Sequence, residues 1–183
     1  MSDMLESMPH NRPHNEPRNG ALSPLARLVA TADGLVRAVA QPDLVQAVLR
    51  VALAVPFWRS GILKWDGFLQ LNDTAIDLFT QEFVLHLPGG PYPFPMPAVM
   101  AFLSGCGEIT FPILLVLGLA TRFAGLGLLF MTLIVELTVP DGWPIHITWA
   151  AMALAIIASG PGALSLDNWL CARGRLAGRI DRD

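Results

Sequence analysis

The chain has 183 residues, of which 53% are hydrophobic and only 15% are charged, and its formal net charge is −3. The length leaves room for one domain, and the composition is too apolar for an ordinary soluble protein, so together they predict an integral membrane protein. The acidic balance does not support a nucleic-acid partner, and the two cysteines, Cys106 and Cys171, form no CxxC pair that would indicate a dithiol redox centre.

The first 40 residues divide into a polar tail and an amphipathic segment. Residues 1–20 are rich in Pro, Asn and His and offer little to bury, so we expect a disordered tail rather than a signal peptide. In residues 21–40, apolar side chains recur at helical spacing, and Arg27, Asp33 and Arg37 fall between them. This pattern predicts a helix in the membrane interface, and the alternative is a helix packed on the bundle with one face in solvent.

Four later segments are long and apolar enough to cross a bilayer core about 30 Å thick. They are residues 44–63, 97–118, 123–139 and 143–159. Arg50 and Arg59 interrupt the first segment, and we expect Arg50 to reach the interface by snorkelling. The sequence therefore predicts an all-α fold, an integral membrane four-helix bundle that follows the amphipathic N-terminal helix. Residues 44–170 form the predicted four-span domain, and residues 171–183 form a basic cytoplasmic tail.

The long connection at residues 64–96 lies between the first and second predicted spans. Its first half, NDTAIDLFTQEFVLHL, can form a short amphipathic helix. Its second half, PGGPYPFPMP, has too many prolines for helix or sheet, and we expect it to be extended. The whole connection is expected to cover the outer mouth of the bundle.

The arginines predict the orientation of the chain in the membrane. With four spans, eight of them fall on one side: Arg27, Arg37, Arg50, Arg122, Arg173, Arg175, Arg179 and Arg182. That side is expected to be cytoplasmic, because basic residues near span ends stay inside. We therefore predict a multi-pass protein of the inner (plasma) membrane with cytoplasmic N- and C-termini.

Glu108 is a lone carboxylate in the second predicted span. It shares a helical stripe with Gly105 and Pro112, and small residues on that stripe predict contact with other helices rather than with lipid. Arg59 is the basic residue within the apolar layer, so we expect Arg59 and Glu108 to form a buried polar site. Such a pair either fixes the register of two helices or acts on a ligand or a proton, and the sequence leaves both roles open.

A second polar pair is predicted near the outer face. The turn PDG at residues 140–142 places the third and fourth spans side by side, with Glu136 shortly before it and His146 shortly after it. We expect these two residues to be neighbours, either as an interfacial pair without chemistry or as a pair that passes protons or binds a cation. No metal-ligand cluster of recognisable spacing is present in the sequence, so no metal site is predicted.

With these positions marked, residues 50–170 resemble the DoxX family of four-span membrane proteins. The resemblance rests on Arg50, Phe57, Gly61 and Lys64 in RVALAVPFWRSGILK, on Gly105 and Glu108 before the run that ends in GLATRF, and on GPGALSLD after the last span. The chain departs from the family pattern at three positions: Ala54 replaces a glycine, and Phe111 and Pro112 replace paired glycines.

The resemblance implies a small subunit of a membrane oxidoreductase system, linked in some members to quinone or quinol and thiosulfate chemistry. On this hypothesis the buried polar site accepts a quinone oxygen or carries a proton, and the partners are other membrane or periplasmic subunits. The sequence contains neither a haem-ligand pair nor a cysteine cluster, so no intrinsic cofactor is expected, and whether the chain is an enzyme stays open. The alternative is a membrane scaffold or transporter-like component of an exported peptide or metal-handling system, with the proline-rich loop as its contact surface.

Overall fold

A computed structural model describes residues 24–180, with side chains described as far as Arg173. The predicted tail at residues 1–20 and the end of the predicted basic tail, residues 181–183, lie outside the described residues. The chain divides into two compact units, Met1–Ala38 and Val39–Asp183. The helices are α1 (Pro24–Val39), α2 (Pro42–Ile62), α3 (Asp73–Asp77), α4 (Pro97–Leu117), α5 (Thr121–Thr138), α6 (Trp143–Ser159) and α7 (Leu166–Ile180), with a π-helical turn η1 (Leu78–Glu82) and a 3-10 turn η2 (Pro140–Gly142).

The α1 helix accounts for the described part of the first unit. None of its residues is buried, and its apolar side chains, among them Leu25, Leu28 and Val36, are exposed. Arg37 pairs with Asp33 one turn earlier at 2.8 Å on the polar side. The helix is therefore amphipathic, with its apolar stripe uncovered.

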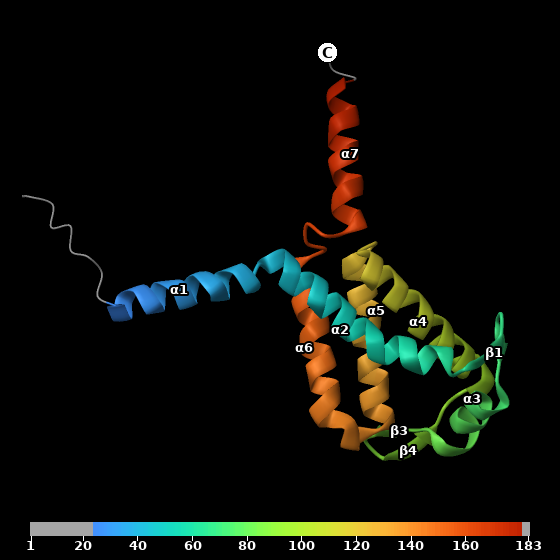
Figure 1. Cartoon of the computed structure of the whole chain (residues 1–183). Coiled ribbons are helices and arrows are strands. Elements are labelled where there is room, and N and C mark those ends of the chain that lie inside the picture. Colours follow the sequence, from blue (N-terminus) through green and yellow to red (C-terminus); the bar gives the residue numbers. More distant parts are fainter. Residues whose placement is uncertain (1–23, 181–183) are drawn as a thin grey trace, which may run out of the picture. The chain divides into compact units, whose positions relative to one another are not determined.

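The second unit is built around α2, α4, α5 and α6. α2 packs against α4 and α6, and α5 packs against the same two helices, so the four helices close a ring (Figure 1). Their apolar core consists of Leu53, Phe57, Leu115, Ala124, Leu128, Ala153 and Ile156. We call the end of the bundle where α2 ends and α4 begins the loop end, and the opposite end, where α4 ends and α5 begins, the tail end.

Length and composition identify the helices that can cross a membrane. Among the described residues, α4, α5 and the stretch Pro140–Ser159 are each long and apolar enough to cross a membrane. α2 is long and apolar enough only when it is taken together with α1. Gln46, Arg50 and Arg59 interrupt the apolar sequence of α2, which is why α2 alone falls short. The fold is an all-α membrane bundle with three such helices, or four when α1 and α2 count as one span.

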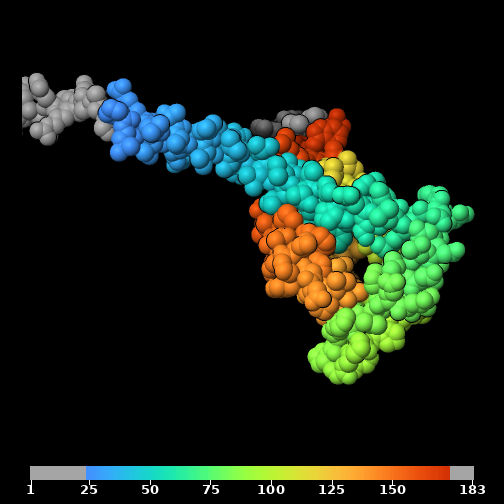
Figure 2. Space-filling model, turned by 60° about the horizontal axis from the view of Figure 1, so that its bottom comes forward, coloured from blue at the N-terminus to red at the C-terminus, as the bar shows by residue number. Residues whose placement is uncertain are grey.

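The connection between α2 and α4 contains more strand than the sequence predicts. A first hairpin pairs β1 (Trp65–Gly67) with β2 (Gln70–Leu71), and a second pairs β3 (Val84–Leu87) with β4 (Gly90–Pro93). The short helix is present as α3, and η1 continues it to Glu82. Figure 2 shows this segment, in green, as one continuous mass beside the end of α2.

The prediction that prolines keep the second half of this connection out of a sheet was wrong. Pro91 pairs with His86 and Pro93 pairs with Val84, with Tyr92 between them. Hydrogen-bonded and non-hydrogen-bonded residue pairs alternate along an antiparallel hairpin. Pro91 and Pro93 are two residues apart, so both occupy the same kind of position in β4. The hairpin can therefore form without an N–H donor from either proline.

Candidate functional site

Glu108 lies on the buried stripe of α4, between Gly105 and Pro112. The residue is only 5% exposed. Ser104, one turn earlier, donates its hydroxyl to Glu108 Oε1 at 3.2 Å. Pro112 has no N–H to donate to the carbonyl of Glu108, so the helix leaves that carbonyl without its usual donor. The stripe therefore combines a buried carboxylate with an altered backbone turn.

Lys64 is the charged partner of Glu108. Its Nζ donates to Glu108 Oε2 at 2.6 Å and to Ser60 Oγ at 3.0 Å. The side chains of Lys64 and Glu108 are 14% and 6% exposed, so both charges are largely removed from solvent and from lipid. A pair of this kind needs both members, because the loss of one leaves an uncompensated buried charge.

A glycine lets α2 come close enough to α4 for this pair to form. Gly61 is buried, and a Cβ placed there would lie 2.9 Å from Glu108 Cβ and 3.0 Å from the Glu108 backbone. The helix ends one residue later, at Ile62, and the Lys64 amide donates to the Gly61 carbonyl at 3.1 Å. The chain thus turns away from α2 where the Lys64 side chain can reach back to α4.

Trp65 adds an unpartnered donor next to the pair. Its ring packs on Gly105, where a Cβ would lie 2.7 Å from Cζ2, and it meets Phe102 edge to face with ring centroids 5.5 Å apart. The indole Nε1 is buried and has no hydrogen-bond partner in the described part of the chain. Buried donors are normally satisfied, so this unpaired N–H is unusual, and it shares that property with Nε and Nη1 of Arg50 among the described residues.

The partner of Glu108 differs from the predicted one. Arg59 is exposed, and its helix phase explains why: the buried residues of this turn are Phe57 and Gly61, and a step of two residues rotates a side chain by about 200°. Arg59 therefore points away from the face that meets α4. The sequence signal for the actual partner is Gly61 followed three residues later by Lys64, but Lys64 lies just beyond the apolar run of residues 44–63.

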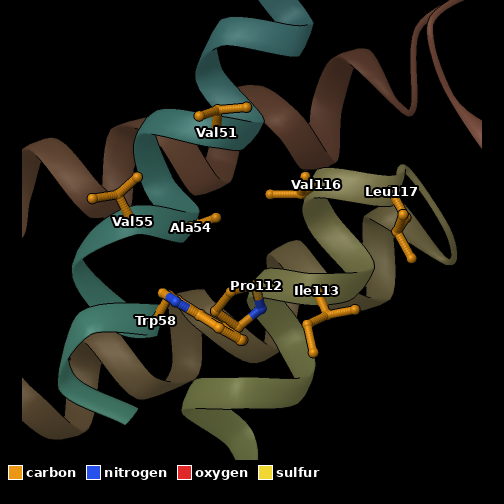
Figure 3. A pocket seen from close by; sticks show the side chains of 8 residues that line it. All are labelled: Val51, Ala54, Val55, Trp58, Pro112, Ile113, Val116 and Leu117. Carbon is orange, nitrogen blue, oxygen red and sulfur yellow. The ribbon is translucent and has the colours of Figure 1, made fainter. Parts of the chain in front are cut away.

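An apolar groove of about 360 Å³ lies between α2 and α4. Its lining residues are Val51, Ala54, Val55, Trp58, Pro112, Ile113, Val116 and Leu117 (Figure 3). Pro112 follows Glu108 by one turn on the same buried stripe, and Trp58 comes one turn before Gly61 and Ile62. The loop end of the groove therefore leads toward the Lys64–Glu108 pair.

Glu136 and His146 are brought together by the turn between α5 and α6. His146 Nδ1 lies 2.7 Å from Glu136 Oε2, and the two side chains are 8% and 23% exposed, respectively. The turn is η2, and Gly142 at its end has no side chain to collide with the imidazole that packs on it. The structure therefore contains two acid–base pairs toward the loop end, one between α2 and α4 and one between α5 and α6.

A polar network at the tail end was missed by sequence reasoning. Arg50 is 3% exposed, so it does not snorkel as predicted: its Nη2 donates to the carbonyl of Leu164. Gln46, one turn earlier, donates to the carbonyl of Gly160 at 2.5 Å, and Asp43 accepts from the amide of Ala163 at 2.6 Å. The polar residues of α2 thus hold the segment that follows α6.

Asp167 closes the same network from α7. Its carboxylate accepts from the Ala120 amide at 2.8 Å and from the Thr121 amide and hydroxyl at 2.9 Å, so it satisfies free amides at the start of α5. Burial opposes ionisation of Asp167, but the hydrogen bonds from Thr121 and Ala120 and the charge of Arg50 outweigh it and hold the pKa of this carboxyl below its ordinary value. This cluster ties α5, α2 and α7 together and has the features of a structural lock.

The described residues contain no group of three or more His, Cys, Asp or Glu side chains that could hold a metal ion. The two pairs, Lys64–Glu108 and Glu136–His146, each place an acidic and a basic side chain in contact, and of the two only Glu136–His146 contributes to the lining of a groove. Of these, the Lys64 site also has the free indole N–H of Trp65.

Comparisons with known proteins place the sites in context. Residues 45–141 match the family model described as DoxX, a match that begins within α2, ends within η2, and includes Lys64, Glu108 and Glu136 but not His146. The chain is similar to a protein of Haemophilus influenzae described as uncharacterized, with 28% identity over 135 residues, or 66% of this chain and 80% of that protein. No solved structure matches the chain.

Proposed function

The chain belongs to the DoxX family, and from that premise we propose that this multi-pass membrane protein is a small subunit of a redox system that binds a quinone in the α2–α4 groove. The observation that carries the proposal is the buried Lys64–Glu108 ion pair, which lies beyond the loop end of an apolar groove of about 360 Å³. An apolar wall with a few convergent polar groups is the general form of a site for a small amphiphilic ligand.

The residues present fit a quinone. The groove between α2 and α4 offers apolar and aromatic contacts, including the Trp58 ring, to an isoprenoid chain or a ring face. The ammonium of Lys64 and the unpartnered indole N–H of Trp65 are donors for a carbonyl oxygen. The quinone would supply the electron-accepting chemistry that these side chains lack.

The chain's own contribution is to bind, orient and handle protons. Lys64 and Ser104 already hold the two oxygens of the Glu108 carboxylate, which fixes its position. We propose that this carboxylate handles the proton of the bound quinone, with the ammonium of Lys64 as its charged partner. Electrons have to come from another subunit, so we propose other membrane or periplasmic subunits as partners, in the inner membrane and with the chain's termini cytoplasmic.

Quinone binding can be tested with the protein's own tryptophans as the reporter. In protein reconstituted into phosphatidylcholine vesicles, decylubiquinone should quench tryptophan fluorescence with a saturable dependence, because Trp58 lines the groove. Ala54→Leu fills the groove and Trp65→Phe removes the unpaired donor, and each should weaken binding about threefold to tenfold, as expected for overpacking or for the loss of one hydrogen bond.

The matched control is Ile145→Ala, at an exposed apolar residue of α6 that lines neither groove. It should leave the quenching curve unchanged. Quenching that is linear in quinone, or equal affinities for the wild-type protein and the two site variants, would show partition into the bilayer and reject the site.

A further inference from the structure

The β1–β2 hairpin carries two large apolar residues in its turn. Gly67 pairs with Gln70, so the turn between the strands consists of Phe68 and Leu69. Phe68 is 93% exposed and Leu69 is 54% exposed. The backbone of Leu69 has a φ of 57°, a conformation that turns usually assign to Gly or Asn. Apolar side chains thus occupy the tip of the hairpin, where small or polar residues are the rule.

The base of the hairpin is fixed to both α2 and α4. Asn72 donates its amide to the carbonyl of Lys64 at 2.9 Å and its Nδ2 to the carbonyl of Leu63, just after α2, at 2.6 Å. Trp65, the first residue of β1, packs its ring on Gly105 of α4. The position of the turn relative to the helix bundle is therefore set by contacts at both strands.

These contacts place the hairpin beside a spanning helix rather than beyond its end. Gly105 is the eighth residue after Pro97, which is about 12 Å along α4 at 1.5 Å per residue. α4 is long and apolar enough to cross a membrane. Figure 1 shows the turn directed back along the flank of the bundle, toward the tail end. Ile62 and Leu63, at the end of α2, are 46% and 74% exposed, so the apolar surface of α2 continues up to the hairpin.

The polar residues of the hairpin define the level at which it meets the bilayer. Asp66 and Gln70 flank the turn and are exposed. A carboxylate is too costly to place deep among acyl chains, so the whole hairpin does not belong in the hydrocarbon core. An element with an apolar side and a polar side fits the boundary between headgroups and acyl chains.

We propose that the β1–β2 turn inserts into the bilayer at this boundary, with Phe68 and Leu69 among the acyl chains and Asp66 at the headgroups. The inserted turn anchors a hairpin whose base carries Lys64 and Trp65, and so it helps to hold both side chains against α4. The proposal does not depend on quinone binding, because it concerns lipid contact by residues that line neither groove.

Fluorescence quenching from two sides tests the insertion. In full-length protein with Cys106→Ala and Cys171→Ala, an NBD fluorophore is attached at Phe68→Cys, and the protein is placed in phosphatidylcholine nanodiscs, which leave both membrane faces open to solutes. Leu103→Cys, at a 57% exposed residue of α4, is the lipid reference, and Gln81→Cys, at an exposed polar residue of the same connection, is the aqueous reference.

A spin-labelled phosphatidylcholine should quench the probe at position 68 about as strongly as the probe at position 103 and several-fold more than the probe at position 81. Iodide should give the opposite order. Quenching by iodide equal to that at position 81 would place the turn in water. Protection from both quenchers would place it against a partner protein or a second copy of the chain, and either result would overturn the proposal.

Two variants of Phe68 test its part in the insertion. With the fluorophore moved to Gln70→Cys, Phe68→Ser should lower quenching by the spin-labelled lipid, whereas Phe68→Leu should retain it, because leucine keeps an apolar side chain at the tip. Phe68 is 93% exposed, so neither change alters the core of the bundle. Equal lipid quenching in Phe68→Ser and in the parent protein would refute the role of Phe68.

Discussion

The absence of a side chain at Gly61 brings α2 close enough to α4 for Lys64 to reach Glu108. The sequence predicted that Glu108 would be buried, because Gly105 and Pro112 mark the stripe of α4 that meets other helices. It did not predict the partner, because Arg59 lies inside the apolar run whereas Lys64 lies just outside it. Arg59 does not lie on the buried face of α2, and the chain turns after Ile62 so that the Lys64 side chain reaches Glu108. Neither effect can be predicted from composition.

Replacing Gly61 should therefore separate the two helices. Gly61→Ala puts a Cβ within 2.9 Å of Glu108 Cβ, and overpacking of this kind costs about 1–3 kcal/mol. The midpoint of SDS or thermal unfolding in detergent should fall. Gly34→Ala in α1 is the control, because no atom lies within 4 Å of the added methyl group. An unchanged midpoint in Gly61→Ala would contradict the close approach of α2 and α4.

The Lys64–Glu108 pair should be strongly coupled. Lys64→Met or Glu108→Leu alone leaves a buried charge and should cost about 3–5 kcal/mol, whereas the double replacement should cost clearly less than the sum. Asp33 and Arg37 form the control pair: their side chains are 56% and 79% exposed, and exposed helical pairs couple by only about 0.3–0.5 kcal/mol. Additive effects at Lys64 and Glu108 would contradict the ion pair.

At the scale of elements, the ends of helices are held by residues far away in sequence. Asp167 of α7 bonds the first amides of α5, and residues of α2 bond the segment after α6. The apolar period of the sequence was enough to predict the four helices of the bundle, but it did not predict α7, which covers Leu166–Ile180 and so includes part of the predicted basic tail. The lock between them and the β3–β4 hairpin were not predicted, because single polar residues and prolines reveal their partners only once the helices are in place.

Removing the Asp167 carboxylate should weaken the bundle at its tail end. Asp167→Ala leaves the Ala120 and Thr121 amides without their acceptor, and loss of a helix-end acceptor costs about 0.5–2 kcal/mol. The unfolding midpoint at neutral pH should fall accordingly. The control is Asp73→Ala, which removes an exposed carboxylate in the loop connection, and this change should have a smaller effect.

The same carboxyl predicts a dependence of stability on pH. The folded-state pKa of Asp167 lies below its ordinary value, so the unfolded chain takes up the proton first as pH falls. Its stabilisation is complete above the unfolded pKa of about 3.9 and is lost as pH falls from there through the folded pKa. Unfolding of the wild-type protein and of Asp167→Asn between pH 6 and pH 3 should show the wild type losing more stability. Parallel pH profiles would exclude this contribution.

At the scale of the whole molecule, the two sites and the lock lie toward opposite ends of the bundle. Lys64 and the Glu136–His146 pair belong to the loop end, whereas Arg50 and Asp167 belong to the tail end. Two further arginines belong to the tail end: Arg122 lies at the start of α5, and Arg173 lies in α7. The distribution of basic residues therefore predicts that the tail end is cytoplasmic.

Reporter fusions test this sidedness. Fusions after residues 80, 121, 141 and 175 should read out, in, out and in, because the first and third positions lie in connections at the loop end and the other two at the tail end. At each position, two reporters are fused in separate experiments, one active only in the cytoplasm and one active only outside it, and each serves as the control for the other. An external signal after residue 121 or 175 would reverse the orientation and move both acid–base pairs to the cytoplasmic face.

The bonds from α2 to residues 160–164 also set an order of events during synthesis. Gln46 and Arg50 leave the ribosome early, but their acceptors, the carbonyls of Gly160 and Leu164, are made more than 100 residues later. Until then α2, the least apolar helix of the ring, lacks the acceptors that Gln46 and Arg50 Nη2 bond in the folded chain. Its final placement in the bilayer has to wait until α6 has been inserted, so a nascent chain that stalls before residue 160 would leave the first span unfinished and exposed to membrane quality control.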